Sequence, residues 1–341
     1  MVVHPMQVAA AVAGAMFFAC ISSASLDQAL AQPIAASGDA AARTGAAVAA
    51  PSLEVATPPR GRVYLFRGAL GPIFSRGMDR LTEKLGHAGI RADVYEFTIC
   101  RLVAAQAVRD YRDDPAPVSL IGHSMGGLCA LKFAEMFRDE DIPVSLVVTI
   151  DPAHASPEVP LNVERYINIF LSDGVLGGGD VAARQGYQGH YASFDLARQE
   201  EVTHINIEKM DSIHEQLVTA ILRLAATPAK AEGKAVALRY VVPPNTPVEL
   251  WDSGKALVAR SGDTLQKLAT LHRVPLWSLT QINQMPDSAA LTAGQIINIP
   301  RHLMPATTIP AQPPPAARRY GARASSSEAG SGSRRGRASG P

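Results

Sequence analysis

Cysteine is scarce in this chain, with three residues among 341. That count excludes a disulfide-dense scaffold, and no run of Cys, His, Asp and Glu has the spacing of a metal site. An excess of one charge is also absent, because 32 Lys and Arg balance 31 Asp and Glu. A near-neutral chain has no overall attraction for nucleic acid. We therefore expect no metal, no other cofactor and no nucleic-acid partner.

Long apolar runs are lacking too, even near the amino terminus. Residues 8–21 form an apolar stretch that is too short to span a bilayer. A small-residue site, Ala29-Leu30-Ala31, follows it and would permit cleavage before Gln32. The segment before the stretch contains His4 but no Lys or Arg, so an uncleaved extension is the alternative. We predict a signal peptide at 1–31, export to the periplasm or the cell exterior, and no transmembrane anchor.

Both ends of the chain have few large apolar residues and are predicted to be tails. Residues 32–60 are rich in Ala and Pro, and residues 301–341 are rich in Ser, Gly and Arg. Such segments cannot bury enough surface to offset the entropy of ordering them. The last segment holds seven Arg against one acid, so it either contacts an anionic polymer or remains solvated.

Two cysteines remain after removal of the signal peptide, Cys100 and Cys129. Both lie in apolar sequence, which favours buried thiols over a disulfide. We predict two buried, unpaired thiols.

Between the tails, short apolar runs alternate with longer helical stretches. This alternation is typical of a parallel sheet with helices on both faces. We expect an α/β domain at 61–226, a linker at 227–255 with one strand near 235–242, and a small unit at 256–300. The expected strands of the first domain are 63–66, 93–97, 118–121, 145–150, 166–171 and 191–196, and its expected helices are 78–88, 102–111, 125–137 and 212–224.

The pentapeptide Gly122-His123-Ser124-Met125-Gly126 directly follows a buried strand and directly precedes an apolar helix. The G-x-S-x-G string alone is common, but this strand–turn–helix setting is the one that a serine nucleophile needs. The glycines let strand and helix pass closely, and the helix amino terminus directs amide dipoles at a developing negative charge. We predict that Ser124 is a nucleophile.

A serine hydroxyl needs a general base, and in this kind of fold the histidine comes last in chain order. Four histidines lie between Ser124 and the end of this domain. His204 lies between the last strand and the last helix, where a loop would bring it above the sheet, whereas His214 falls inside that helix. We favour His204 and keep His214 as the alternative. His154 and His190 are expected to be surface or structural residues.

Two aspartates compete to orient that base. Asp151 ends the fourth strand and precedes Pro152, and Asp173 follows the fifth strand in an Asp-Gly pair. Both lie at the carboxyl edge of the sheet, where open α/β sheets place their ligands. Asp173 occupies the commoner position for this fold, but turn chemistry also explains it. We favour Asp151 and keep Asp173 as the alternative.

An oxyanion formed during acyl transfer needs two backbone N–H donors. The amide of Met125, the residue after the nucleophile, is expected to be one. The loop after the first strand would supply the other, from Ala69 or Leu70.

Residues 61–226 resemble a compact member of the α/β-hydrolase superfamily, because Gly-His-Ser-Met-Gly-Gly is similar to the elbow of lipases, esterases and thioesterases. The Ile-Asp-Pro after the fourth strand resembles the acid position of some lipases. The resemblance implies acyl transfer from a carboxylic ester or thioester. No insertion is long enough to form a lid, which argues against a deep pocket for long-chain lipids.

A second set of residues spans the unit 256–300. Its members are Ser261-Gly262-Asp263-Thr264-Leu265, Leu268-Ala269, Val274-Pro275, Leu279, Asn283, Leu291, Gly294-Gln295 and Ile299-Pro300. This pattern resembles a LysM domain, with a βααβ order in which Asp263 or Thr264 caps the first helix. The resemblance implies binding of peptidoglycan, chitin or another N-acetylglucosamine-containing glycan. The residues it assigns to the glycan groove are Gly262, Asp263, Thr264, Leu265, Asn283, Met285 and Pro286.

The sequence therefore predicts a secreted serine hydrolase that is held at peptidoglycan and cleaves a small ester or other acyl substrate through an acyl-enzyme on Ser124. Two alternatives stay open. One is a non-catalytic wall-binding protein with a degenerate hydrolase domain, and the other is a deacylase that acts on the glycan itself.

Overall fold

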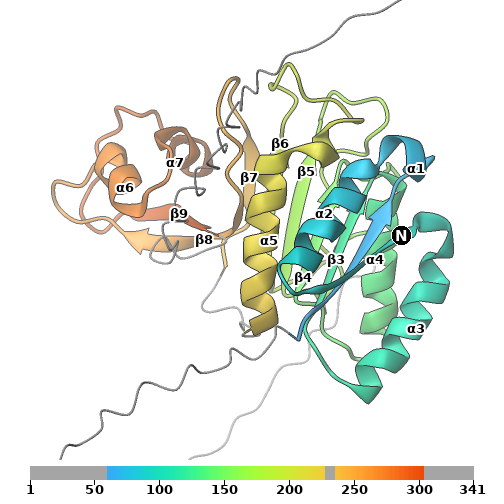
Figure 1. The fold of residues 1–341 in the computed structure, drawn as a ribbon. Helices are drawn as coiled ribbons and strands as arrows, with labels where there is room; N and C mark the ends of the chain where they lie inside the picture. Colours follow the sequence, from blue (N-terminus) through green and yellow to red (C-terminus); the bar gives the residue numbers. More distant parts are fainter. Residues whose placement is uncertain (1–59, 227–234, 303–341) are drawn as a thin grey trace, which may run out of the picture. The chain divides into compact units, whose positions relative to one another are not determined.

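A seven-stranded parallel sheet, in the order β2-β1-β3-β4-β5-β6-β7, organises most of the chain (Figure 1). The computed structural model describes residues 60–226 and 235–302; the expected signal peptide, nearly all of both tails and residues 227–234 lie outside these ranges. The strands are β1 (Arg62–Arg67), β2 (Arg91–Glu96), β3 (Val118–His123), β4 (Leu146–Ile150), β5 (Arg165–Phe170), β6 (His190–Asp195) and β7 (Leu238–Val241). The predicted α/β class is confirmed.

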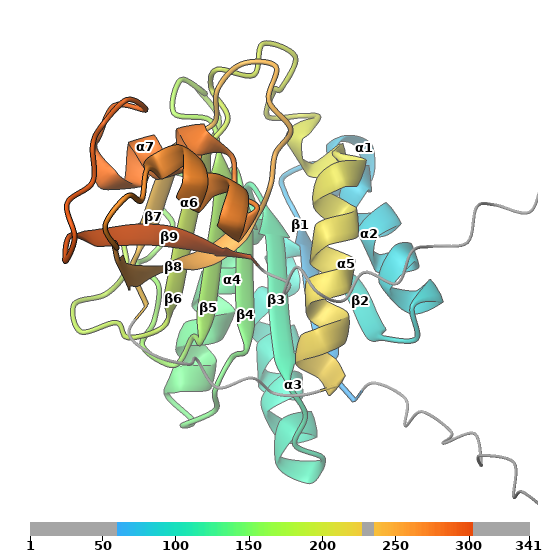
Figure 2. The same ribbon diagram turned by 90° about the vertical axis from the view of Figure 1, so that its left-hand side faces the viewer.

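Helices cover both faces of this sheet (Figures 1 and 2). On one face lie α2 (Arg76–His87) and α5 (Asp211–Ala226), and on the other lie α3 (Cys100–Asp113) and α4 (Met125–Arg138). Each pair packs its apolar side chains on the sheet and so closes a separate core. Short helical turns, α1 (Gly71–Phe74), η1 (Phe97–Ile99) and η2 (Ile207–Lys209), lie in the connections.

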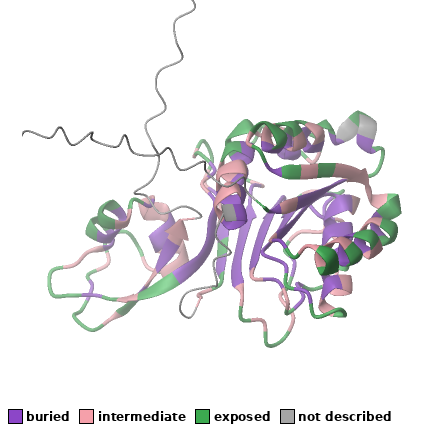
Figure 3. Ribbon diagram, turned by 60° about the horizontal axis from the view of Figure 1, so that its bottom comes forward, coloured by how far each residue is buried: buried purple, intermediate pink, exposed green. Residues whose placement is uncertain are grey.

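The strands in the middle of the sheet are buried at every position (Figure 3). β4, with the sequence Leu-Val-Val-Thr-Ile, is a nearly continuous apolar run, as is typical of parallel strands covered on both faces. The edge strand β2 is partly exposed and carries the alternating sequence Arg-Ala-Asp-Val-Tyr-Glu. Burial therefore follows the order of the strands in the sheet.

The strand order reverses beside β1. The chain passes from β1 to β2 on one side and then returns to place β3 on the other side of β1. Connections that leave neighbouring strands in opposite directions open a crevice at the carboxyl ends of those strands. The chain segments after β1 and β3 therefore border this crevice.

The C-terminal unit has the predicted βααβ order. Its elements are β8 (Trp251–Val258), α6 (Leu265–His272), α7 (Leu276–Asn283) and β9 (Ile296–His302), and the two strands pair antiparallel. Thr264 caps α6, because its Oγ1 accepts a hydrogen bond from the Lys267 amide at 3.2 Å. Across the ranges 60–226 and 235–302, no helix has the length and apolar character needed to cross a membrane.

The described residues belong to one compact unit of the chain, and the segment 235–255 contributes to it. β7 is the seventh strand of the large sheet. Trp251, at the start of β8, is fully buried, and its ring centroid lies 5.9 Å from that of Phe194 in β6. The side chain of Gln281 in α7 bonds both the amide and the carbonyl of Val241 in β7, at 3.0 and 2.8 Å.

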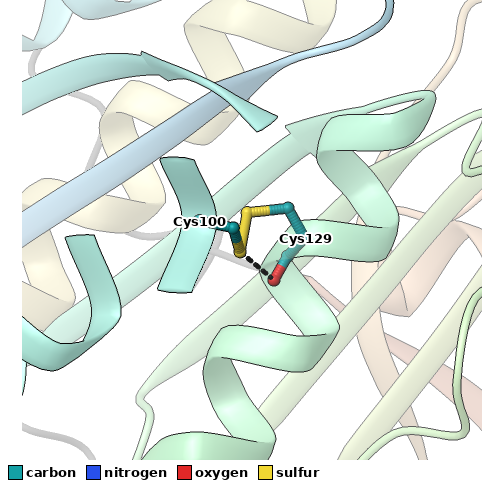
Figure 4. Close-up of a disulfide and its surroundings, with 2 residues drawn as sticks. All are labelled: Cys100 and Cys129. Atoms are coloured by element: carbon teal, nitrogen blue, oxygen red, sulfur yellow. Dashed lines mark hydrogen bonds between the residues drawn. A yellow bond between two sulfur atoms is a disulfide. The ribbon is translucent and has the colours of Figure 1, made fainter. Parts of the chain in front are cut away.

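Cys100 and Cys129 form a disulfide (Figure 4), so the prediction of two buried thiols is wrong. Both residues are buried, as expected, but the start of α3 packs against α4 and brings the two Cα atoms to 5.8 Å. That separation lies in the range a disulfide requires. Apolar sequence around each cysteine indicates burial, but it says nothing about which distant residue lies opposite.

Candidate active site

Ser124 lies in a sharp turn between β3 and α4, with φ 55° and ψ −122°. Such angles are unfavourable for a residue with a side chain and persist only where the surroundings fix them. Here the Ser124 amide donates to the Ile150 carbonyl at 3.0 Å, and the Ser124 carbonyl accepts from the amides of Gly127 and Ala153 at 2.9 and 3.1 Å. The neighbouring strand and the following helix therefore hold the turn.

Two glycines make this turn possible. A Cβ atom at Gly122 would lie 2.0 Å from the Gly126 carbonyl oxygen, and one at Gly126 would lie 2.1 Å from the Phe66 carbonyl oxygen. A side chain at either position would collide with backbone that cannot move aside. The G-x-S-x-G spacing is therefore a steric requirement of the turn.

Asp151 and His204 form a hydrogen-bonded pair. The Asp151 carboxylate is fully buried at the end of β4, and its Oδ2 lies 2.6 Å from His204 Nδ1. Its Oδ1 accepts from the Leu171 amide at 3.2 Å, which fixes the orientation of the carboxylate. A histidine that donates Nδ1–H to a carboxylate keeps Nε2 available for a substrate proton.

The loop that carries His204 lies against the turn at Ser124. The ring centroids of His204 and His123 are 4.8 Å apart, and His123 Nε2 donates to the His204 carbonyl at 2.9 Å. Because His123 directly precedes Ser124, the structure brings Ser124, His204 and Asp151 into one cluster. They follow β3, β6 and β4, respectively, at the same edge of the sheet.

The alternative base and acid have other surroundings. His214 is fully buried within α5, where its Nε2 donates to the Glu208 carbonyl at 2.8 Å and burial lowers its pKa. Asp173 is exposed in a turn that the Gly174 amide closes on the Leu171 carbonyl at 3.2 Å. The His214 side chain thus has a backbone partner next to its own helix, and Asp173 lies exposed in a turn.

The two remaining histidines also have other partners. His154 is on the surface, with Nε2 3.3 Å from the Val175 carbonyl. His190 is buried, and its Nδ1 lies 2.6 Å from Ser253 Oγ.

The loop after β1 contacts Ser124. A Cβ atom at Gly68 would lie 2.8 Å from Ser124 Cβ, so the loop backbone passes directly beside the serine. The Gly68 amide donates to Ser75 Oγ at 3.1 Å, while Ala69 and Leu70 follow on an exposed stretch. Met125 is the first residue of α4, where helix amides have no partner within the helix. Met125 thus directly follows Ser124, and Ala69 and Leu70 directly follow Gly68, the residue that lies against it.

His123 is a residue whose role the sequence pattern did not reveal. Its side chain is buried, and its Nδ1 accepts from Ser75 Oγ at 2.8 Å while its Nε2 donates to His204. Ser75 in turn accepts from Gly68, so one chain of hydrogen bonds joins the loop after β1 to the loop that carries His204. Burial, with the neighbouring His204, lowers the pKa of His123 to about 4, so the ring is neutral. His123 occupies the first x of G-x-S-x-G, a position that accepts any residue, so the motif does not indicate this role.

The loops that the LysM resemblance assigns to glycan binding lie side by side, because Thr264 pairs with Ala290 in an antiparallel bridge. Most of the assigned side chains have structural partners. Asp263 accepts from the Arg260 amide, Leu265 is buried, and Asn283 bonds the backbone of Asn298.

The remaining assigned residues differ in exposure. Gly262 and Pro286 are exposed, and Met285 is partly buried and contacts the Gln295 amide group through its sulfur. In the part of the chain that the structure describes, no cluster of three or more His, Cys, Asp and Glu side chains could hold a metal ion.

Residues 258–300 match the family model of the LysM domain. The comparison with curated proteins gave no match. Among solved structures, 50% of this chain is similar to 89% of the esterase domain of a Rhodothermus marinus protein, at 18% identity and a TM-score of 0.35.

Two further solved structures are similar over part of the chain. A candidate hydrolase of the alpha/beta superfamily from Xanthomonas campestris pv. campestris aligns with 49% of this chain and 96% of its own, at 16% identity and a TM-score of 0.29. The RedJ thioesterase of prodiginine biosynthesis in Streptomyces coelicolor aligns with 33% of this chain and 50% of its own, at 20% identity and a TM-score of 0.23. The fold assignment rests on the strand order and the turn at Ser124.

Proposed function

We propose that this chain, an α/β-hydrolase fold followed by a LysM domain, is a serine hydrolase that cleaves a carboxylic ester or thioester. The observation that carries the proposal is the buried Asp151–His204 pair, 2.6 Å between Oδ2 and Nδ1, beside a serine held at strained backbone angles. Turn formation alone requires neither the strain nor a buried carboxylate.

The reaction follows from this arrangement. His204 takes the proton of the Ser124 hydroxyl as Oγ attacks the acyl carbonyl, and the Asp151 carboxylate stabilises the imidazolium that results. The amides of Met125 and of Ala69 or Leu70 bind the oxyanion. His204 then protonates the leaving alcohol or thiol. Water, deprotonated by His204, attacks the acyl-enzyme and releases the carboxylic acid and Ser124.

Two features support export and attachment to the cell wall. Disulfides persist in oxidising compartments, and Cys100–Cys129 is one. The LysM match at 258–300 favours binding to peptidoglycan or a related N-acetylglucosamine-containing glycan. Both are in accord with the signal peptide expected at 1–31. We propose a periplasmic or extracellular enzyme held at the wall.

Covalent labelling with a fluorophosphonate tests the proposal. The wild-type chain should label and Ser124→Ala should not, because the probe reacts with an activated serine. Ser172→Ala, which removes an exposed serine at the same edge of the sheet, is the matched control and should label like wild type. A folded wild-type chain that does not label would support the degenerate, wall-binding alternative.

A second measurement addresses the alternative substrate. If the enzyme is a deacylase of the glycan, it should release acetate from acetylated peptidoglycan faster than it hydrolyses short-chain nitrophenyl esters at matched acyl concentration. We favour the soluble ester, and faster release of acetate from acetylated peptidoglycan would overturn that choice.

A further inference from the structure

Large apolar side chains remain exposed on the loops that carry the catalytic groups. Leu70 is 66% exposed, Ile73 65%, Val175 89%, Leu176 61% and Ile205 45%. We call these five residues the apolar rim. Five large apolar residues left in water around one site indicate a binding surface, whereas single exposed residues would not.

Each member of the apolar rim is tied to a group of the active site. Leu70 follows Ala69 in the loop beside Ser124, and Ile73 lies in α1, which continues that loop. Ile205 directly follows His204. Figure 1 shows α1, the chain after β5 and the segment leading into α5 at the same end of the sheet.

The chain after β5 brings the other two members to the acid. A Cβ atom at Gly177 would lie 2.0 Å from Asp151 Oδ1, so this backbone passes against the carboxylate. The Gly178 amide donates to the Pro152 carbonyl at 2.5 Å, which holds the segment there. Val175 and Leu176 directly precede this contact, and their side chains are exposed next to it.

The carboxyl and amino ends of the strands differ in how many large apolar side chains are exposed beside them. Among residues 60–226, the other exposed large apolar side chains are Ile99, Leu102 and Leu161. Ile99 and Leu102 follow β2 and flank the catalytic edge, whereas Leu161 precedes β5 and lies at the opposite edge. Exposed apolar surface is therefore concentrated where the chemistry takes place.

We propose that the apolar rim binds the acyl chain of the substrate, so that the enzyme prefers esters of apolar acids several carbons long to acetyl esters. This inference rests on the proposed function, because the acyl carbon must reach Ser124. An acyl chain attached to that carbonyl would lie beside the loops that carry Leu70, Ile205 and the Val175–Leu176 segment. An open rim binds the part of a chain nearest the carbonyl, so the benefit of added carbons should level off.

The test is kcat/KM for p-nitrophenyl esters from acetate to decanoate, each below its aggregation concentration. Burial of one methylene contributes at most about fourfold, so the wild-type value should rise by two- to fourfold per carbon and then level off. The variant Val175→Ser/Leu176→Ser should lose about tenfold on octanoate and little on acetate. Leu161→Ser, at the opposite edge, is the matched control and should follow wild type.

Several outcomes would overturn the proposal. A flat or falling profile for wild type would do so, as would an equal loss on acetate and octanoate in the double variant. A rate that rises only above the aggregation concentration would indicate docking on a lipid surface and would also overturn it. Fluorophosphonate labelling distinguishes failure of the proposed function from failure of the acyl-chain preference. A chain that labels at Ser124 but has a flat profile would support the proposed function and contradict the acyl-chain preference.

Discussion

The carboxyl edge of the large sheet, where Ser124 and Asp151 lie, and the loops of the LysM domain differ in backbone conformation and in the partners that hold them. At the catalytic edge, Ser124 and Asp151 have φ values of 55° and 43°, and the polar groups are buried. In the LysM domain, positive φ falls on Gly262 and Gly294, which adopt it without steric cost, and on Arg273 and Gln284, which end α6 and α7. Ser124 and Asp151 are held in strained positions by segments distant in sequence, whereas Asp263 and Thr264 in the LysM loops bond to near neighbours in sequence.

This difference has an energetic consequence. A side-chain residue in an unfavourable backbone region costs roughly 1–3 kcal/mol, which the rest of the fold must offset. The partners that hold Ser124 come from Ile150 and Ala153, and those that hold Asp151 come from Ile169 and Leu171. In the LysM domain, Thr264 and Asp263 bond residues three positions away. Substitutions far in sequence from Ser124 should therefore still alter activity. Substitutions in the LysM loops should alter only the structure of their near neighbours.

The largest effect should come from replacing each of the two candidate bases in turn. His204→Ala removes the partner of Asp151 and should lower kcat for a soluble ester by about a thousandfold or more. His214→Ala leaves the Glu208 carbonyl without its donor, so it should lower the free energy of unfolding by about 1–3 kcal/mol with kcat within a few fold of wild type. Steady-state kinetics and urea unfolding of both variants check this. The reverse pattern of kcat would exchange the roles of the two histidines.

The disulfide should give the next largest effect, on stability. Cys100 and Cys129 are 29 residues apart in sequence, and a loop of that size is constrained by about 3 kcal/mol in the unfolded state. The double variant Cys100→Ala/Cys129→Ala should lose about that much free energy of unfolding and keep its activity below the transition. Reduction of the wild type should reproduce the loss, and reductant should leave the double variant unchanged. Equal stability of oxidised and reduced wild type would refute the bond.

His123 provides a test of the long-range connections themselves. His123→Phe keeps a ring but removes the bonds to Ser75 and His204, so kcat should fall by about tenfold to a hundredfold while KM changes little. His123→Gln can keep a donor for the His204 carbonyl and should recover part of the loss. An equal loss of kcat in both variants would show that the volume of the side chain, and not its hydrogen bonds, determines the effect.

The same residue predicts how stability depends on pH. The pKa of His123 is about 4 in the fold, below its ordinary value of 6.5. Between these values the unfolded chain binds more protons, so the free energy of unfolding should fall as the pH is lowered from 6.5 to 4. His123→Gln should flatten this dependence by an amount on the order of 2 kcal/mol. His190, whose pKa burial also lowers to about 4, should account for part of the slope that remains.

Features that depend on neighbours in sequence could be predicted from the sequence, whereas features that depend on packing between distant segments could not. The LysM unit and the turn at Ser124 could be predicted because their requirements are local: a cap three residues away, or glycines two residues on either side. The disulfide and the bridge made by His123 could not, because both depend on which segments pack together. The preference for His204 over His214 was based on the distinction between loop and helix, and it stays a prediction.

The smallest expected effect concerns the glycan loops. Pro286 is exposed in the loop after α7, beside the segment that pairs with Thr264. Pro286→Asp replaces an apolar ring with a charge that must lose water against a sugar, so binding to chitin oligosaccharides should weaken by about tenfold, or roughly 1.4 kcal/mol. Leu271→Asp introduces the same charge at an exposed position of α6 and serves as the matched control. Because the oligosaccharide is neutral, general charge repulsion is absent, and equal binding by both variants would place the glycan site away from this loop.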